Sequence, residues 1–198
     1  MRIGILGGTF NPIHYGHLLV AAEVREKFDL EKVIFVPSAC PPHKNHPDIA
    51  PPQDRYQMTV LATQSNPFFS VSNLELERSG KSYSIETVKE LLNIYGKDTK
   101  LYFITGTDAI LEIFTWKDRE ELLKLCQFIV ATRPGFYIGK IDKSIVRQIH
   151  LIEIPGLDIS STDIRSRINE GRSIKYLLPE KVEEYIYKHG LYKIERIR

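Results

Sequence analysis

Short apolar runs alternate with amphipathic stretches along almost the whole chain. Runs such as Val33-Ile34-Phe35-Val36 and Leu101-Tyr102-Phe103-Ile104 are apolar without alternation, which is typical of strands that are buried on both faces. We predict strands at residues 2–6, 32–36, 69–74, 100–105, 127–131 and 150–154. We predict helices at residues 16–28, 53–65, 85–95, 117–125, 161–170 and 179–189.

Strands that alternate with helices through short links indicate an α/β fold. We expect a Rossmann-like, doubly wound, mainly parallel sheet with helices on both faces, and ligands beyond the carboxyl ends of its strands. The length suits one domain with a full core, so residues 1–198 are expected to form a single domain. Residues 37–52 hold six of the eleven prolines, and we predict a long loop there, of a kind that is usually functional or disordered.

Composition and charge narrow the class of protein. The net charge of +2 is too small to indicate a nucleic-acid polymer or a membrane surface as partner. No run of about 18 apolar residues is present, so no membrane-spanning helix is expected. Cys40 and Cys126 are far apart and form no CxxC pair, so we expect two small buried side chains and a cytoplasmic location.

The strongest chemical signal lies between the first predicted strand and the first predicted helix, Gly7-Gly8-Thr9-Phe10-Asn11-Pro12-Ile13-His14-Tyr15-Gly16-His17. Glycines allow a backbone to approach a ligand closely, and the free N–H groups of a helix N-terminus favour phosphate. His14 and His17 are expected on one side of the first helical turn, where two imidazoles can donate to phosphoryl oxygens. A G-x-G-x-x-G fingerprint is missing, and a P-loop before Lys81 fails because Glu75 stands where its first glycine belongs.

A second phosphate signal starts the helix predicted at 161–170. Ile159-Ser160-Ser161-Thr162-Asp163-Ile164-Arg165 combines hydroxyl side chains at a helix start with an arginine. Such a start binds anions through its dipole and its N–H groups, and the guanidinium binds phosphate oxygens in pairs. Helix capping beside a solvated arginine is the plain alternative. Together with the first motif, the segment indicates a clamp for the outer phosphates of a triphosphate.

Zinc is the rival ligand for the histidines. His14 and His17 form one pair and His43 and His46 form another with the same spacing, and zinc accepts imidazole readily. The second pair lies in the proline-rich loop with only Cys40 nearby as a further ligand. We therefore predict no protein-bound structural metal.

The two phosphate motifs together resemble the nucleotidyltransferase superfamily with the H-x-G-H signature. Within it, the chain resembles the bacterial nicotinate mononucleotide adenylyltransferases over nearly its whole length. Further matching segments are Pro41-Pro42-His43-Lys44, Ser82-Tyr83-Ser84-Ile85-Glu86-Thr87, Phe103-Ile104-Thr105-Gly106-Thr107-Asp108, Trp116, Arg133-Pro134-Gly135, Ser173-Ile174-Lys175-Tyr176-Leu177-Leu178-Pro179, Tyr185-Ile186 and His189-Gly190-Leu191-Tyr192. The phosphate motifs indicate the superfamily, and Trp116 and the tail favour the narrower family.

The resemblance implies that ATP and nicotinate mononucleotide react with Mg²⁺ to give nicotinate adenine dinucleotide and pyrophosphate, a late step in making NAD. It implies direct in-line attack of the mononucleotide phosphate on the α-phosphorus, with no covalent enzyme intermediate. By the same resemblance, His14 and His17 are the catalytic pair. The implied ATP-binding residues are Gly7, Gly8, Thr9, Phe10, Gly16, Lys44, Asp108, Ser161, Thr162 and Arg165. The implied residues for the pyridine substrate are Ser84, Thr87, Trp116 and Arg133, and Ser84 departs from the threonine expected there.

Several alternatives stay open. Trp116 also fits a core aromatic, Asp108 a helix cap, Lys44 a solvated loop residue and Arg133 a turn residue. Sister enzymes, such as phosphopantetheine adenylyltransferases or cytidylyltransferases, share the first motif, and a regulator that only binds ATP is a rival of another class. The preference between nicotinate and nicotinamide is not legible in the sequence. A homo-oligomer is compatible with apolar edge strands.

Overall fold

One parallel sheet runs through the structure, a computed structural model that describes residues 1–40, 49–132 and 148–193. Its strands are β1 (Arg2–Gly8), β2 (Lys32–Pro37), β3 (Phe69–Val71), β4 (Lys100–Gly106), β5 (Gln127–Thr132) and β6 (Ile149–Glu153). Their order is β3-β2-β1-β4-β5-β6, and each neighbouring pair is parallel. The predicted doubly wound sheet is confirmed, and the strand order reverses between β1 and β4, where such folds bind ligands.

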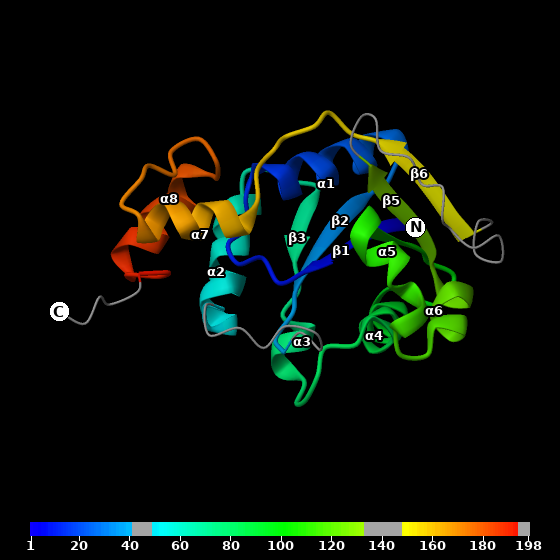
Figure 1. The fold of residues 1–198 in the computed structure, drawn as a ribbon. Coiled ribbons are helices and arrows are strands. Elements are labelled where there is room, and N and C mark those ends of the chain that lie inside the picture. Colours follow the sequence, from blue (N-terminus) through cyan, green and yellow to red (C-terminus); the bar gives the residue numbers. More distant parts are fainter. Residues whose placement is uncertain (41–48, 133–147, 194–198) are drawn as a thin grey trace.

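Helices cover both faces of this sheet (Figure 1). They are α1 (Tyr15–Lys27), α2 (Pro52–Thr63), α3 (Leu74–Glu77), α4 (Ser84–Tyr95), α5 (Thr107–Leu111), the 3-10 turn η1 (Ile113–Thr115), α6 (Arg119–Leu125), α7 (Ser161–Asn169) and α8 (Glu180–Lys188). Figure 1 shows α2, α7 and α8 gathered at one end of the molecule, and α2 packs on α8. The C-terminal helices therefore extend the layer on one side of the sheet.

Two apolar cores lie on the two faces, because successive strand residues point to opposite sides. In β4, Leu101 and Phe103 enter one core with α4, α5 and α6. Tyr102 and Ile104 enter the other, which includes residues of α1, α2, α7 and α8. Strands buried on both faces explain the uninterrupted apolar runs in the sequence.

Three local expectations were wrong. The strand predicted at 69–74 ends at Val71. Leu74 begins α3, and its N–H group donates a hydrogen bond to the Ser72 hydroxyl. The short segments α5 and η1 were not predicted, because five and three residues are too few for a periodic pattern. Cys126 is buried as expected, and burial raises the pKa of its thiol to about 12. Cys40 is exposed.

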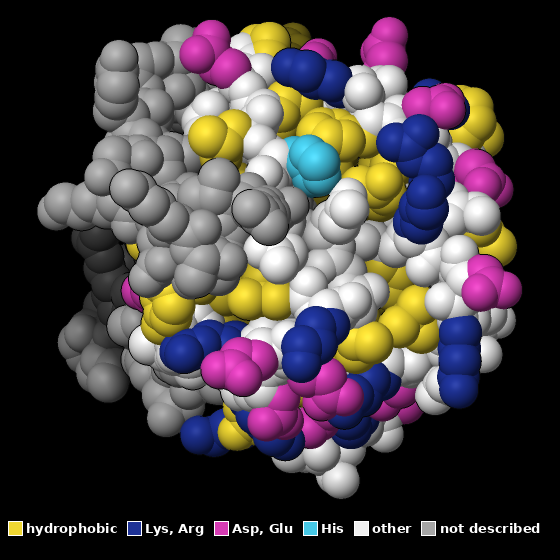
Figure 2. Space-filling view, turned by 90° about the vertical axis from the view of Figure 1, so that its right-hand side faces the viewer, with side chains coloured by type: hydrophobic (Ala, Val, Ile, Leu, Met, Phe, Trp, Pro, Cys, Tyr) yellow, Lys and Arg dark blue, Asp and Glu magenta, His cyan; other side chains and the backbone are white. Residues whose placement is uncertain are grey.

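Charge is evenly mixed on the face shown in Figure 2, where lysines and arginines lie among aspartates and glutamates. This picture agrees with the small net charge of +2. Among the described helices, none is both long enough and apolar enough to cross a bilayer.

Candidate active site

A tight turn follows the central strand. Gly7 and Gly8 end β1 between β2 and β4, and a Cβ on Gly8 would lie 3.0 Å from the Phe10 ring. Phe10 has a φ of 47° and is 2% exposed, a left-handed conformation that is uncommon for a bulky side chain. Strain of this kind persists only where surrounding packing enforces it, so the turn is held rigidly at the carboxyl edge of the sheet.

His14 and His17 lie together at the start of α1, as predicted. Their ring centroids are 3.8 Å apart, and the Phe10 and His17 rings make a T-shaped contact with their centroids 5.1 Å apart. The backbone N–H of His14 donates to Nδ1 of His17 at 3.2 Å. Nδ1 therefore carries no proton, so neutral His17 is protonated at Nε2 and offers a donor there.

Gly16 gives the His14 ring its space. A Cβ at this position would lie 3.0 Å from both Cε1 and Nδ1 of the His14 ring. His14 itself is 6% exposed, so the ring has little room to move aside. The glycine of the H-x-G-H motif thus leaves space for the ring of the histidine two residues before it.

The second motif is joined to the first. Ser160 caps α7 by accepting from the N–H of Asp163. The Ser161 hydroxyl donates to the Pro12 carbonyl at 2.8 Å, and Nη1 of Arg165 donates to the Asn11 carbonyl at 2.9 Å. Two segments about 150 positions apart in sequence therefore hold each other in place. Through these contacts, α7 supports the segment that leads into His14.

The first of two large cavities contains the histidine pair, and we name it the histidine cavity. Its volume is about 600 Å³. Gly16 and Asp108 also line it, together with Thr105 and Gly106 at the end of β4. Asp108 is exposed and is the second residue of α5, which Gly106 caps. Asp108 is therefore placed to meet a ligand in this cavity, and it is not the cap of α5.

The second large cavity lies beside Trp116, and we name it the tryptophan cavity. Its volume is about 660 Å³, and Ser84 and Thr87 of α4 also line it. Trp116 packs against Phe103 and Phe128 with centroid distances of 5.6 and 6.1 Å. The indole is half-buried, so it is anchored in the core and still forms part of the cavity wall. Both interpretations of Trp116, core aromatic and cavity wall, hold at once.

A buried polar network supports the tryptophan cavity. The Thr87 hydroxyl donates to Glu75 Oε1 at 2.7 Å and accepts from Arg78 at 3.2 Å. Arg78 also pairs with Glu86 and Glu90. A hydrogen bond from Lys117 holds the pKa of Glu86 below its usual value. Thr87 therefore uses its hydroxyl within the protein, and this geometry favours a supporting role over direct ligand contact.

The two large cavities share part of their walls. Gly7, Thr105 and Ala109 line both. These residues lie at the carboxyl ends of β1 and β4 and in α5, where the strand order reverses. Two ligands bound side by side would therefore meet above Gly7, next to His14 and His17.

Sequence reasoning missed Arg55. This side chain is fully buried in α2, and it donates to the carbonyls of Ala50, Thr9 and Ala39 at 2.9, 2.7 and 3.2 Å. It thus ties the glycine turn to both ends of the proline-rich loop, and burial lowers the pKa of the guanidinium. An arginine three residues before the buried Met58, on the core face of a helix, was the available signal.

Some predicted ligands lie outside the described residues. Lys44, His43 and His46 fall in the segment 41–48, and Arg133 falls in the segment 133–147. Their predicted roles stay predictions. In the part of the chain that is described, no group of three or more histidine, cysteine or acidic side chains is arranged to hold a metal ion.

Known proteins are similar to this chain in sequence. The cytidylyltransferase-like family model matches residues 5–167. A protein of Thermoanaerobacter sp. (strain X514), described as "Probable nicotinate-nucleotide adenylyltransferase", is 55% identical, with 98% of this chain and 95% of the relative covered. A protein of Moorella thermoacetica with the same description is 56% identical, with coverages of 97% and 92%.

Solved structures agree with these relatives. The Plasmodium falciparum nicotinic acid mononucleotide adenylyltransferase complexed with NaAD is 26% identical and superposes with a TM-score of 0.78, covering 96% of this chain and 97% of that one. The turn at Gly7-Gly8, the histidine pair, the two joined cavities and this similarity over nearly the full length lead to one assignment. The chain belongs to the cytidylyltransferase-like family and, within it, to the nicotinate-nucleotide adenylyltransferases.

Proposed function

We propose that this chain transfers the adenylyl group of ATP to nicotinate mononucleotide, giving nicotinate adenine dinucleotide and pyrophosphate in NAD biosynthesis. One observation carries the proposal. The histidine cavity and the tryptophan cavity share Gly7 and Thr105 at the point where the strand order reverses. An enzyme that joins two nucleotides needs two such sites with a common boundary at the reacting atoms.

ATP occupies the histidine cavity in this proposal, with its ribose near Asp108 and its phosphates near His14 and His17. The mononucleotide occupies the tryptophan cavity, with its pyridine ring against Trp116. Its phosphate then points toward Gly7 and the turn. Gly7 adds no side chain to this boundary, which leaves space for the two phosphates to approach each other.

The reaction is a single displacement. A phosphate oxygen of nicotinate mononucleotide attacks the α-phosphorus of ATP, a new P–O bond forms, and the bond from the α-phosphorus to the bridging oxygen breaks. The electron pair of that bond leaves with pyrophosphate. The N–H donor at Nε2 of His17 stabilises the negative charge that grows on the phosphoryl oxygens. The nearby His14 ring adds to this stabilisation.

A carboxylate on the pyridine ring fits the tryptophan cavity. Ser84 is the first residue of α4 and lines the cavity, so the positive end of this helix faces it. Lys81 and Lys117 are further lining residues, although Glu75 and Glu112 balance them. The preference for nicotinate over nicotinamide is thus expected to rest on helix N–H groups and the Ser84 hydroxyl.

Mg²⁺ is the cofactor in this proposal, and it would neutralise the phosphates of ATP. Mg²⁺ typically keeps several waters and binds substrate phosphates with few protein ligands. The lack of a metal-binding side-chain cluster among the described residues is compatible with that mode. The cytoplasmic location and a homo-oligomer stay predictions.

The test compares acceptors in the release of pyrophosphate from ATP with Mg²⁺. Nicotinate mononucleotide, nicotinamide mononucleotide and phosphopantetheine are supplied separately. We expect the fastest turnover with nicotinate mononucleotide. Turnover driven by phosphopantetheine would assign the chain to a sister activity. ATP binding without turnover for any acceptor would favour a regulator.

A further inference from the structure

One wall of the tryptophan cavity is built from segments that are far apart in the sequence. Thr9 of the glycine turn, Ser38 after β2, and Ser82 and Ser84 around the start of α4 all line this cavity. The sheet holds the first two segments together, because the N–H of Ser38 donates to the Gly8 carbonyl at 2.9 Å. Ser82 lies between α3 and α4 and belongs to no strand, so its place in the wall depends on contacts outside the sheet.

Three hydrogen bonds join Ser82 to the residues after β2. Its hydroxyl accepts from the backbone N–H groups of Ala39 and Cys40 at 3.1 and 3.3 Å, and its own N–H donates to the Cys40 carbonyl at 3.0 Å. A hydroxyl oxygen has two acceptor positions, and both serve this contact. Ser82 is 8% exposed, which leaves little room for water to replace the hydroxyl. The side chain therefore ties the chain after β2 to the segment that begins α4.

The contact at Ser82 continues to the glycine turn. The Ala39 carbonyl accepts from Nη2 of Arg55 at 3.2 Å, and Nη1 of the same guanidinium donates to the Thr9 carbonyl at 2.7 Å. Arg55 is fully buried and does not line the tryptophan cavity, so it acts from behind the wall. We name the series Ser82, Ala39, Arg55 and Thr9 the hydrogen-bond chain. Both of its ends, Ser82 and Thr9, line the cavity.

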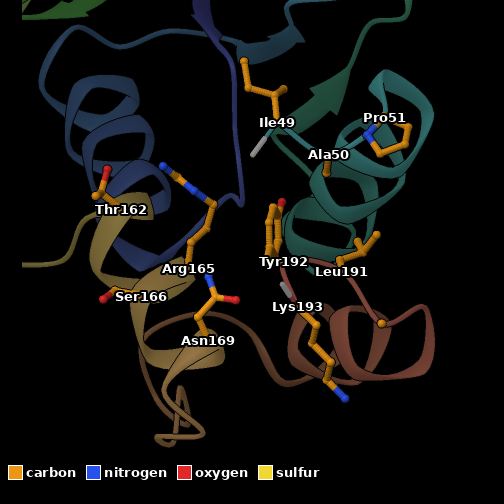
Figure 3. A pocket seen from close by; sticks show the side chains of 11 residues that line it. Ile49, Ala50, Pro51, Thr162, Arg165, Ser166, Asn169, Leu191, Tyr192 and Lys193 are labelled. Carbon is orange, nitrogen blue, oxygen red and sulfur yellow. The ribbon is translucent and has the colours of Figure 1, made fainter. Parts of the chain in front are cut away.

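Arg55 is held firmly in the middle of this chain. Its Nε donates to the carbonyl of Ala50 at 2.9 Å, two residues before α2 (Figure 3). Figure 3 shows Thr162 and Arg165 of α7 on the other side of a cavity of about 460 Å³ from Ala50, and neither residue lines the two large cavities. Each nitrogen of the planar guanidinium thus donates to a different carbonyl, which fixes its orientation. A rigid group at this point can pass a displacement from one end of the chain to the other.

We propose that Ser82 is a positioning residue for the acceptor substrate, and that it places the start of α4 relative to the glycine turn through Ala39 and Arg55. This inference rests on the proposed adenylyl transfer. Ser84 is expected to hold the pyridine carboxylate, and Thr9 belongs to the turn that borders the meeting point of the two phosphates. A shift between these ends moves the attacking oxygen away from the α-phosphorus, and a misplacement of about 1 Å can cost about 100-fold in rate.

The first test compares Ser82→Ala, which removes the acceptor of two N–H groups, with Ser82→Thr, which keeps the oxygen. Ser173→Ala is the matched control, because the Ser173 hydroxyl also accepts a backbone N–H, from Lys175, and lines neither large cavity. We expect Ser82→Ala to lower kcat/KM for nicotinate mononucleotide by about tenfold or more and to change the KM for ATP by less than about twofold. Ser82→Thr is expected to lie closer to wild type, and Ser173→Ala to equal it.

The second test asks whether Ser82 acts through Arg55. Lysine at position 55 keeps a positive charge and loses the planar fork that reaches three carbonyls. We expect the double variant Ser82→Ala/Arg55→Lys to lose no more kcat/KM than the worse single variant, because both substitutions break the same hydrogen-bond chain. Each assay is run well below the unfolding temperature of the variant. Single losses that multiply in the double variant would show independent action and would overturn the inference.

Two other results would also overturn it. One is a wild-type kcat/KM in Ser82→Ala. The other is a rise in the KM for ATP as large as the loss in kcat/KM for nicotinate mononucleotide, which would indicate a general structural role for the hydroxyl. Failure of the proposed function looks different, because the wild-type protein then shows no turnover with nicotinate mononucleotide before any substitution is made. That result would remove the inference together with its substrate.

Discussion

His17 has two nitrogen atoms with two tasks. Nδ1 accepts from the backbone of His14 and closes the first turn of α1, and this contact leaves the proton of the neutral ring on Nε2. The local structure of the helix start therefore decides which nitrogen atom of the ring is left as a donor for a ligand. A substitution can separate the two tasks.

We predict that His17→Asn lowers kcat by about 100-fold or more, as the loss of one donor to a developing charge typically does. Asparagine keeps a side-chain oxygen that can accept from the His14 N–H, as the N3 residue of a capping box does, so the helix start is retained. ATP affinity is expected to change little. Steady-state kinetics and equilibrium titration with ATP measure the two effects, and His189→Ala serves as a control on an exposed histidine. Equal losses of turnover and ATP affinity would favour a protein that only binds ATP.

Gly16 allows a prediction in which one added methyl group displaces the His14 ring. Alanine in a helix is favoured over glycine by about 1 kcal/mol, but this methyl group would press on a ring that is only 6% exposed, so Gly16→Ala is expected to gain no stability in thermal unfolding. Its Cβ would lie 3.0 Å from the His14 ring and displace that ring. We therefore expect kcat to fall by about tenfold or more, because small misplacements of catalytic groups are costly. An unchanged kcat would show that the His14 ring has other room.

At the scale of elements, Arg55 connects α2 to the glycine turn and to the loop ends. Arg55→Met keeps the apolar stem and leaves three carbonyls without this donor, the one in the buried contact at Ala50 and those in the partly buried contacts at Thr9 and Ala39. We expect the free energy of unfolding to fall by about 3 kcal/mol or more, since each unsatisfied group costs about 1–3 kcal/mol. Urea denaturation measures this loss. Arg172→Met, at an exposed arginine, is the control, with a change within about 0.5 kcal/mol.

The contact between α8 and α2 is sensitive to alkaline pH. Burial and the hydrogen bond to Asp54 raise the pKa of Tyr185 from 10.0 to about 12. A pKa raised on folding means that this stabilisation is complete below pH 10 and is lost as the pH rises toward 12. We predict that Tyr185→Phe is less stable by about 1 kcal/mol at neutral pH and shows a shallower loss between pH 10 and 12. Parallel alkaline profiles of the two proteins would argue against this contact.

At the scale of the whole molecule, one sheet places two adjoining cavities along its carboxyl edge. Of these two cavities, Trp116 lines the tryptophan cavity but not the histidine cavity, and Asp108 lines the histidine cavity but not the tryptophan cavity. We predict that Trp116→Ala raises the KM for nicotinate mononucleotide by about tenfold or more and leaves the KM for ATP nearly unchanged. Asp108→Ala is expected to give the reverse split. Initial rates with each substrate varied in turn measure both, and a common rise in both constants for either variant would contradict the division.

The sheet was predictable because its strands are buried on both faces. Runs such as Val33-Ile34-Phe35-Val36 cannot be placed at a surface, and each of the six predicted strands overlaps a strand of the structure, although β3 ends three residues earlier than expected. The histidine pair was also predictable, since a spacing of three places two side chains on one helical face. The local sequence pattern is enough to predict a feature that depends only on residues close together in the chain.

Other parts of the site depend on contacts between distant segments. Thr87 and Ser161 were expected to contact ligands, and the structure has their hydroxyls donating to Glu75 and to Pro12. The partner Pro12 is 149 positions away from Ser161. A hydroxyl looks the same in the sequence whether its acceptor is a substrate or a neighbouring chain segment, so periodicity carries no information about the choice.

By itself, the sequence determined the class of fold, the glycine turn after the first strand, the histidine pair and the resemblance to a family of adenylyl-transferring enzymes. These properties follow from hydrophobic periodicity and from residues close together in the chain. Only the tertiary structure decided that two cavities share Gly7, that Arg55 clamps the turn, and that Ser82 lies beside Ala39. Each of these depends on which strands and helices become neighbours when the chain folds, and that is a property of packing across the whole molecule.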